Sequence, residues 1–243
     1  MTFEIMTYNV KGLPWCKDYI EDICVFISKT MPDILCLQEV FTDRGRNFYK
    51  MFLEAIGYTV LLPNDTDVTW LPSGLVTAFK TRKYRLLSKV FCPYIDSHNL
   101  EWFALKGFHV LYLECEGGQR FYVVNTHTQS DTVVTILRSH DIKLIRQKQT
   151  QQLLRFFKGT HDTVLVVGDL NCESEPTAGL RFLHPAGMAP LKKRTFFSTG
   201  EDLDHVACLL DRPLPTVGQV RIFNEPMSDH APVTFHLTLP THK

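Results

Sequence analysis

Residues 163–173 read TVLVVGDLNCE and combine a strongly apolar run with two polar residues directly after it. Residues 164–167 form a short, continuous run of mostly β-branched residues, which is typical of a fully buried strand. Gly168 ends the run, and Asp169 and Asn171 follow it two positions apart, so we expect both side chains to leave the strand end on one face. A carboxylate and an amide placed together can hold a water, a metal or a phosphate oxygen. An ordinary Asx turn after the strand would use the same residues.

Similar apolar runs recur along the chain and predict further strands. These cover residues 3–9, 34–37, 58–62, 75–79, 108–115, 121–125, 206–210, 217–223 and 233–239. Apolar residues at helical spacing predict helices over residues 17–29, 48–55 and 134–157, whereas residues 174–203 read as irregular. Residues 116–119, EGGQ, predict a hairpin turn. Without an internal repeat or a break in composition, the pattern predicts one α-and-β domain over residues 1–243.

The composition narrows the class of protein. Hydrophobic residues make up 44% and charged residues 21% of the 243, which is ordinary for a globular protein with a sizeable core. Lysine plus arginine and aspartate plus glutamate each number 26, so the net charge of zero argues against tight, non-specific binding of nucleic acid. A basic stretch at 80–89 is either a solvated strand face or a phosphate-binding patch. Trp70-Leu71-Pro72 either packs on the domain or touches a lipid or a base.

Neither a membrane span nor a signal peptide is expected from the sequence. No stretch approaches the apolar length of a transmembrane helix, and the N-terminus has no basic start followed by an apolar run. The seven cysteines are odd in number and include no C-x-x-C pair. This pattern favours reduced thiols over a disulfide framework or a zinc site. Reduced thiols in turn favour a cytoplasmic location.

Polar residues gather at six strand ends. They are Tyr8-Asn9, Gln38-Glu39, Asn125-Thr126-His127, Asp169 with Asn171, Asp204-His205 and Asp229-His230. Each alone has an ordinary explanation, such as a solvated strand tip or a turn. Together they supply hard oxygen ligands and imidazoles without paired thiols, a set that suits magnesium and phosphate chemistry better than zinc.

The order of these motifs resembles that of the endonuclease/exonuclease/phosphatase superfamily. The matching segments are 7–10 (TYNV), 37–40 (LQEV), 125–127 (NTH), 168–171 (GDLN), 203–205 (LDH) and 228–233 (SDHAPV). The resemblance spans nearly the whole chain. It implies an α+β fold, a four-layered α/β/β/α sandwich of two packed sheets flanked by helices, and cleavage of phosphoesters with magnesium.

Within that superfamily the sequence is most similar to neutral sphingomyelinases. Residues 9–14, NVKGLP, are similar to their N-V-x-G-L-P motif, and residues 125–129, NTHTQ, to N-T-H-x-Q. That branch also carries an aspartate, four residues and then Lys-Gly, which implies a substrate-binding role for Lys106. Here Lys106-Gly107 fits, but Glu101 stands in place of the aspartate.

The resemblance also implies a role for each site residue. Glu39 would hold Mg²⁺, or Mn²⁺, with the help of Asn9 and Asp229. Asp169 and Asn171 would orient the attacking water and the phosphate, and His127 would donate to a non-bridging oxygen. His230 would act as the base or contact the phosphate, with Asp204 fixing its ring. The choice of Asp169 or His230 as general base stays open at this stage.

Three functions follow from these observations. The first is a magnesium-dependent phosphodiesterase that hydrolyses a phospholipid headgroup, as sphingomyelinases do, with peripheral membrane contact; the balanced net charge favours it. The alternative is a nuclease or nucleic-acid-end phosphodiesterase with the same site, which the basic stretch at 80–89 supports. A catalytically inactive binding module is disfavoured, because every matched catalytic position keeps its residue.

Overall fold

The computed structural model describes residues 1–63, 71–97, 104–131, 139–185 and 194–240. Trp70, Glu101 and the first residues of the helix predicted over 134–157 lie outside the described residues.

Two six-stranded sheets form the body of the structure. The first has the strand order β11-β12-β1-β2-β4-β3, and the second has the order β5-β6-β7-β8-β10-β9. The strands of the first sheet are β1 (Thr2–Gly12), β2 (Ile34–Val40), β3 (Tyr58–Leu61), β4 (Val76–Lys80), β11 (Thr216–Ile222) and β12 (Val233–Thr238). Those of the second are β5 (Tyr84–Pro93), β6 (Gly107–Cys115), β7 (Arg120–His127), β8 (Thr163–Asp169), β9 (Leu180–Phe182) and β10 (Asp204–Leu209). In each sheet one neighbouring pair, β1 with β2 and β7 with β8, is parallel.

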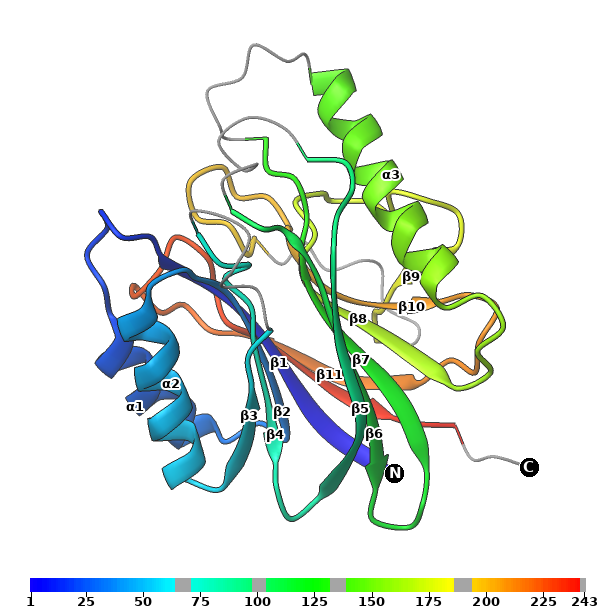
Figure 1. Cartoon of the computed structure of the whole chain (residues 1–243), viewed down its shortest axis with the longest axis horizontal. Helices are drawn as coiled ribbons and strands as arrows, with labels where there is room; N and C mark the ends of the chain where they lie inside the picture. The colour runs from blue at the N-terminus through cyan, green and yellow to red at the C-terminus, as the bar shows by residue number, and fades with distance from the viewer. Residues whose placement is uncertain (64–70, 98–103, 132–138, 186–193, 241–243) are drawn as a thin grey trace.

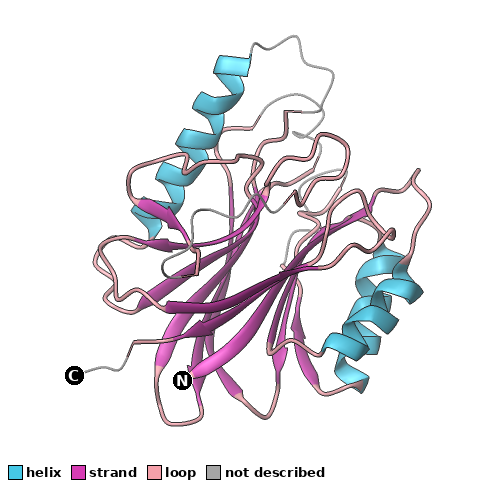
Figure 2. Ribbon diagram, turned by 180° about the vertical axis from the view of Figure 1, so that it is seen from behind, coloured by secondary structure: helices cyan, strands magenta, loops and turns pink. Residues whose placement is uncertain are grey.

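The described helices lie on the outer sides of the sheets, as Figures 1 and 2 show. They are α1 (Ile20–Thr30), α2 (Asp43–Ala55) and α3 (Ser139–Phe156). Residues of α1 and α2, such as Ile27 and Leu53, share a buried cluster with β1 and β2. Leu153 of α3 shares another with β6, β7 and β8. None of these helices combines the length and apolar character that crossing a membrane requires.

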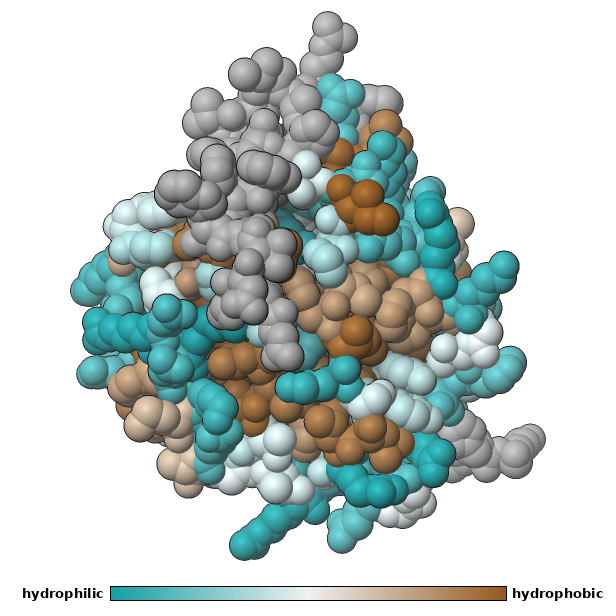
Figure 3. Space-filling view, viewed as in Figure 1, coloured by the Kyte–Doolittle hydropathy of each residue, from teal (hydrophilic) through white to brown (hydrophobic). Residues whose placement is uncertain are grey.

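Alternation along the strands explains the layers. In β1, Phe3 and Ile5 enter the core between the two sheets, whereas Met6 and Tyr8 face the helices. Buried side chains of β6, β7 and β8 complete the inter-sheet core. On the surface seen from the side of Figure 1, brown hydrophobic residues gather near the centre of the view (Figure 3). The predicted four-layered α+β sandwich is therefore confirmed.

Several predicted boundaries are wrong. β1 continues to Gly12, with an irregular register after Asn9, rather than ending at residue 9. The first helix begins at Ile20, not at residue 17. Residues 180–182, predicted as irregular, form the short strand β9 against β10. Three residues carry too little periodicity to be recognised from sequence, and their pairing depends on a distant strand.

The basic stretch at 80–89 is largely paired with carboxylates. Lys80 and Lys83 both bind Asp33 Oδ1, at 3.0 and 2.7 Å. Arg85 binds Glu114. Asp33 directly precedes β2, so this cluster lies at the opposite end of that strand from Glu39. Because these three cations are paired with carboxylates, the structure favours the solvated strand face over the phosphate-binding patch that the sequence left open.

Candidate active site

The strand directions bring the six polar motifs to one edge of the sandwich. Asn9 lies near the carboxyl end of β1 and pairs with Gln38, one residue before Glu39 in parallel β2. His127 and Asp169 end the parallel strands β7 and β8 and are partners in register. Asp204 begins β10, which runs antiparallel, and also pairs with Asp169. His230 precedes β12, which is antiparallel to β1. Carboxyl ends of parallel strands and amino ends of their antiparallel neighbours meet at the same edge.

Glu39 has an unusual backbone conformation, and its carboxylate faces the other polar side chains at this edge, which we call the polar cluster. Its φ is 60°, in the left-handed region that residues other than glycine rarely adopt. Gly12 permits this arrangement, because a Cβ there would lie 2.6 Å from the carbonyl oxygen of Glu39. The side chain is only 19% exposed, so it is not the solvated strand tip that the sequence allowed. Burial raises the pKa of Glu39, while the bond from Asn9 opposes that rise.

Asn9 joins two carboxylates. Its Nδ2 donates to Glu39 Oε1 and to Asp169 Oδ2, each at 3.0 Å. Its Oδ1 accepts the backbone N–H of Lys11 at 3.1 Å. The amide nitrogen thus faces the cluster and the oxygen faces Lys11. This geometry shows Asn9 positioning Glu39 and Asp169, and its predicted role as a metal ligand stays a prediction.

Asp169 takes part both in a turn and in the site. Its Oδ1 accepts the backbone N–H of Asn171 at 3.0 Å, which is the Asx turn, while its Oδ2 faces the cluster. Asn171 donates through Nδ2 to the carbonyl of Thr128. Gly168 is required just before the turn, since a Cβ there would lie 1.9 Å from the carbonyl oxygen of Thr126. Burial raises the pKa of Asp169 to about 7.

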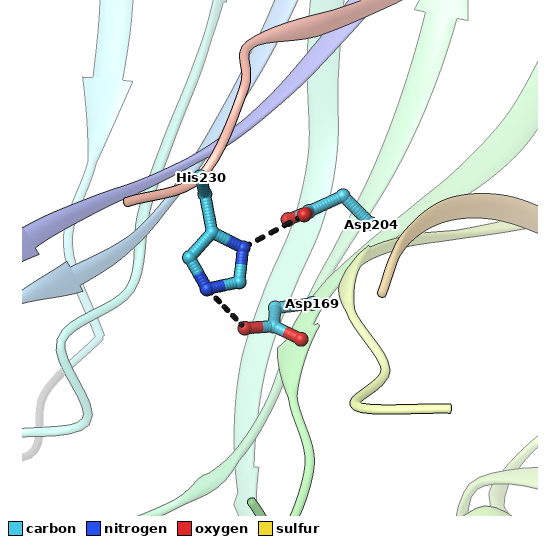
Figure 4. A group of neighbouring side chains, drawn as sticks. All are labelled: Asp169, Asp204 and His230. Carbon is cyan, nitrogen blue, oxygen red and sulfur yellow. Dashed lines mark hydrogen bonds and ion pairs between the residues drawn. The ribbon is translucent and has the colours of Figure 1, made fainter. Parts of the chain in front are cut away.

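His230 lies between two buried carboxylates, as Figure 4 shows. Its Nδ1 donates to Asp204 Oδ2 at 2.8 Å, and its Nε2 lies 3.6 Å from Asp169 Oδ2. The two residues that the resemblance made neighbours are therefore in contact. Burial alone would lower the pKa of His230, but the carboxylates of Asp204 and Asp169 raise it to about 10. Ligand atoms of the three side chains lie within 4.8 Å of one another, a spacing at which they could hold a metal ion only if the ring gave up its proton.

His127 and Lys106 complete the polar cluster, which forms the floor of the cavity described below. Lys106 Nζ lies 3.2 Å from His127 Nε2 and donates to the carbonyl of Thr128 at 2.6 Å. His127 Nε2 is 3.6 Å from Asp169 Oδ2 and 4.0 Å from Glu39 Oε1. Burial and the charges of Lys106 and His230 hold the pKa of His127 well below its ordinary range. The imidazole is therefore neutral at physiological pH.

Asp229 stands apart from this floor, and its partner was missed from the sequence. Its Oδ2 binds Lys11 Nζ at 2.7 Å, and both residues line the cavity above the floor. The variable position of the N-V-x-G-L-P motif was the only sequence signal for Lys11.

A contact between the two sheets that the sequence did not reveal lies beneath these residues. Gln38 Nε2 donates to Asn125 Oδ1 at 2.8 Å, which links β2 to β7 across the two sheets. The sequence identifies both amides as polar residues at strand ends but not as partners of each other.

A cavity of about 1040 Å³ opens above the cluster. Its floor includes Glu39, Lys106, His127, Asp169 and His230. Its walls carry the apolar side chains of Leu13, Trp15, Phe41, Leu71, Phe196 and Leu203. The volume and the mixture of apolar walls with a few convergent polar groups are those of a ligand-binding site.

Comparison with known proteins identifies the family to which the chain belongs. The sequence model of the Endonuclease/Exonuclease/phosphatase family matches residues 6–230. A comparison with curated protein sequences gave no match.

Among solved structures, sphingomyelinase C from Streptomyces griseocarneus is similar with a TM-score of 0.73 and 19% identity over 98% of this chain and 99% of that one. TDP2 from D. rerio in complex with a single-strand DNA product has a TM-score of 0.75 and 16% identity, over 98% and 99%. A mutant beta toxin from Staphylococcus aureus with bound magnesium ions has a TM-score of 0.73 and 16% identity, over 98% and 100%. At these identities the likeness shows a shared fold. The match over residues 6–230 shows that the chain belongs to the endonuclease/exonuclease/phosphatase family, whose members hydrolyse phosphoesters.

Proposed function

We propose that this chain is a phosphodiesterase that depends on a divalent metal and hydrolyses the headgroup ester of a phospholipid such as sphingomyelin. The observation that carries the proposal is the cavity, in which a polar cluster forms the floor and apolar side chains form the walls. A substrate with one phosphodiester and a long apolar portion matches both surfaces at once. The free cysteines are consistent with a cytoplasmic location, which stays a prediction.

The donor set of the cavity fits magnesium. Glu39, Asp169 and Asp229 contribute carboxylates to one cavity, and no thiol is present among its described lining residues. Glu39 would hold the metal, with Asn9 and Asp229 as its predicted helpers, and Mn²⁺ would suit the same oxygen atoms. The S. aureus beta toxin mutant binds magnesium ions on the same fold. When bound, the metal would neutralise charge that develops on the phosphate and the leaving group.

His230 and Asp169 have different roles in the proposed reaction. Both ring nitrogens of His230 face carboxylates, so the ring is held protonated and can bind a phosphate oxygen as a cation. Asp169, with a pKa of about 7, is suited to take the proton from the attacking water near neutral pH. We therefore assign the general base to Asp169. Asn171 would orient the water, and His127, with Lys106 beside it, would contact a non-bridging oxygen.

The charge of the cavity favours a lipid over a nucleic acid. The cavity is lined by three further acids, Asp131, Glu201 and Asp229, in addition to those of the floor. Its described lysines, Lys11 and Lys106, already have partners. Binding of a polyanion requires an excess of cations along its path. At the rim, Trp15 is 73% exposed, and tryptophan favours the boundary between lipid and water. These features support peripheral contact with a membrane.

A substrate panel tests the proposal. Sphingomyelin vesicles, a lysophospholipid, abasic DNA and a soluble nitrophenyl phosphodiester would be compared with Mg²⁺ and with excess chelator. We expect the lipids to be preferred and turnover to disappear with chelator. Preference for DNA would move the assignment to the nuclease alternative, and full turnover in chelator would refute the metal role.

A rim variant tests the lipid contact separately. Trp15→Ala should lower the rate on vesicles more than the rate on the soluble diester. Met51→Ala is the matched control, because Met51 is also 73% exposed but lies on α2, away from the cavity lining. Equal losses on both substrates would contradict a membrane role for Trp15.

A further inference from the structure

Lys11 and Asp229 form an ion pair on the wall of the cavity. Lys11 Nζ lies 2.7 Å from Asp229 Oδ2, and the two side chains are 42% and 27% exposed. Glu39 lines the same cavity. The ammonium of a lysine is charged at physiological pH, so Lys11 presents a full positive charge to Asp229. A carboxylate that would otherwise be open to a metal is thus occupied by a cation of the protein itself.

The backbone holds this pair in place independently of its charges. Lys11 has a φ of 50°, in the left-handed region, and its N–H donates to Asn9 Oδ1. On the other side, Ser228 Oγ donates to the carbonyl of Asn9 at 2.7 Å and lies 3.4 Å from Asp229 Oδ1. Both members are therefore tied to the same residue of β1. A flexible surface lysine would not be expected to have a strained backbone at this position.

We propose that Lys11 competes with the divalent metal for Asp229 and thereby sets the metal affinity of the site. The proposal rests on the metal role described under Proposed function. A metal held by Glu39 can recruit Asp229 only if the ammonium releases it, and two cations near one carboxylate repel each other. Lys11 thus lowers the affinity of the site for metal, and so raises the metal concentration at which the site becomes occupied.

The test measures metal binding without substrate. Calorimetric titration of the metal-free protein with Mn²⁺, and separately with Mg²⁺, would compare wild type, Lys11→Met, Asp229→Asn and the double variant. Lys11→Gly serves as a second variant, because glycine favours the φ of this position. Lys17→Met is the matched control: it removes one positive charge from the loop that follows β1, at a side chain that lies over the Tyr19 ring. Circular dichroism would verify the fold of each variant.

We expect Lys11→Met to tighten metal binding on the order of ten-fold, because the metal no longer has to displace an ammonium from Asp229. The same substitution combined with Asp229→Asn should change affinity by less than about three-fold relative to Asp229→Asn alone, and Lys17→Met should change it little. Equal gains in both backgrounds would show a general charge effect and overturn the competition. No gain from either Lys11 variant, in a protein that binds metal, would also overturn it while leaving the proposed function intact. A protein that binds no metal in any variant would refute the proposed metal role together with this inference.

Discussion

The contact between Asp204 and His230 makes a quantitative prediction. His230 Nδ1 donates to Asp204 Oδ2 at 2.8 Å, and Asp204 is completely buried. Burial would lower the pKa of His230, and Asp204 is the largest of the influences that instead raise it to about 10. Compared with an ordinary value of about 6.5, this preference for the protonated ring is on the order of 5 kcal/mol. Asp204→Asn keeps the size of the side chain and removes the charge, so the pKa of His230 should fall.

The contact predicts three effects on activity. His230→Ala should lower kcat on the order of a hundred-fold or more, as loss of a charged donor to the phosphate does. Adding Asp204→Asn to that variant should cost little more, because the carboxylate acts through the ring. Asp204→Asn alone should shift the alkaline limb of the kcat profile to lower pH, since the ring loses its proton sooner.

The measurements are kcat against pH on the soluble diester at saturating Mg²⁺ and an NMR titration of the His230 ring. His236→Ala is the control, because its Nε2 also lies near a carboxylate, 3.1 Å from Glu4 Oε1, but outside the cavity lining. It should leave the profile unchanged. If the losses from Asp204→Asn and His230→Ala multiply as for independent sites, or if Asp204→Asn leaves the ring titration unmoved, the coupling is wrong and Asp204 acts as a separate ligand or a structural residue.

Three further substitutions test other parts of the structure. Glu39→Gln should lower turnover on the order of a hundred-fold or more with an unchanged circular dichroism spectrum, and loss of that spectrum would make Glu39 structural instead. Asp33→Asn should cost about 1–3 kcal/mol of unfolding free energy at pH 7, because the bonds from Lys83 and Lys80 outweigh burial and lower the pKa of Asp33. This stability is present above the unfolded pKa of about 3.9 and is lost as the pH falls through the folded pKa. Unfolding free energies of the two proteins, measured with urea, should therefore converge in acid. A difference that stays constant with pH would contradict the pairing. Gly168→Ala should not yield a folded protein, since the added Cβ would overlap the Thr126 carbonyl, and a wild-type unfolding midpoint would refute this packing.

Much of the fold could be predicted from the sequence, because buried strands leave a strong local signal. The run 164–167 is apolar on both faces, and the structure buries it between the inter-sheet core and the cluster beneath α3. β1 shows the weaker but readable alternation of Phe3 and Ile5 with Met6 and Tyr8. The three-residue strand β9 has no comparable signal, since its existence depends on β10 as a partner.

The candidate site could be predicted only as a set of residues, and strand direction explains the difference. Asn9, Glu39, His127 and Asp169 lie near the carboxyl ends of strands in two parallel pairs, so polar residues after apolar runs already predict that each pair shares an edge.

Asp204 and His230 precede their strands instead. Their place beside Asp169 follows from antiparallel register, which no local pattern specifies. The same limit hid Lys11, whose partner Asp229 is brought to it by the pairing of β12 with β1. Which cation a carboxylate binds is decided by such distant register. A sequence motif can therefore identify the carboxylates of this site, while the ion pair that one of them forms with Lys11 becomes visible only when the strands of the sheet are assembled.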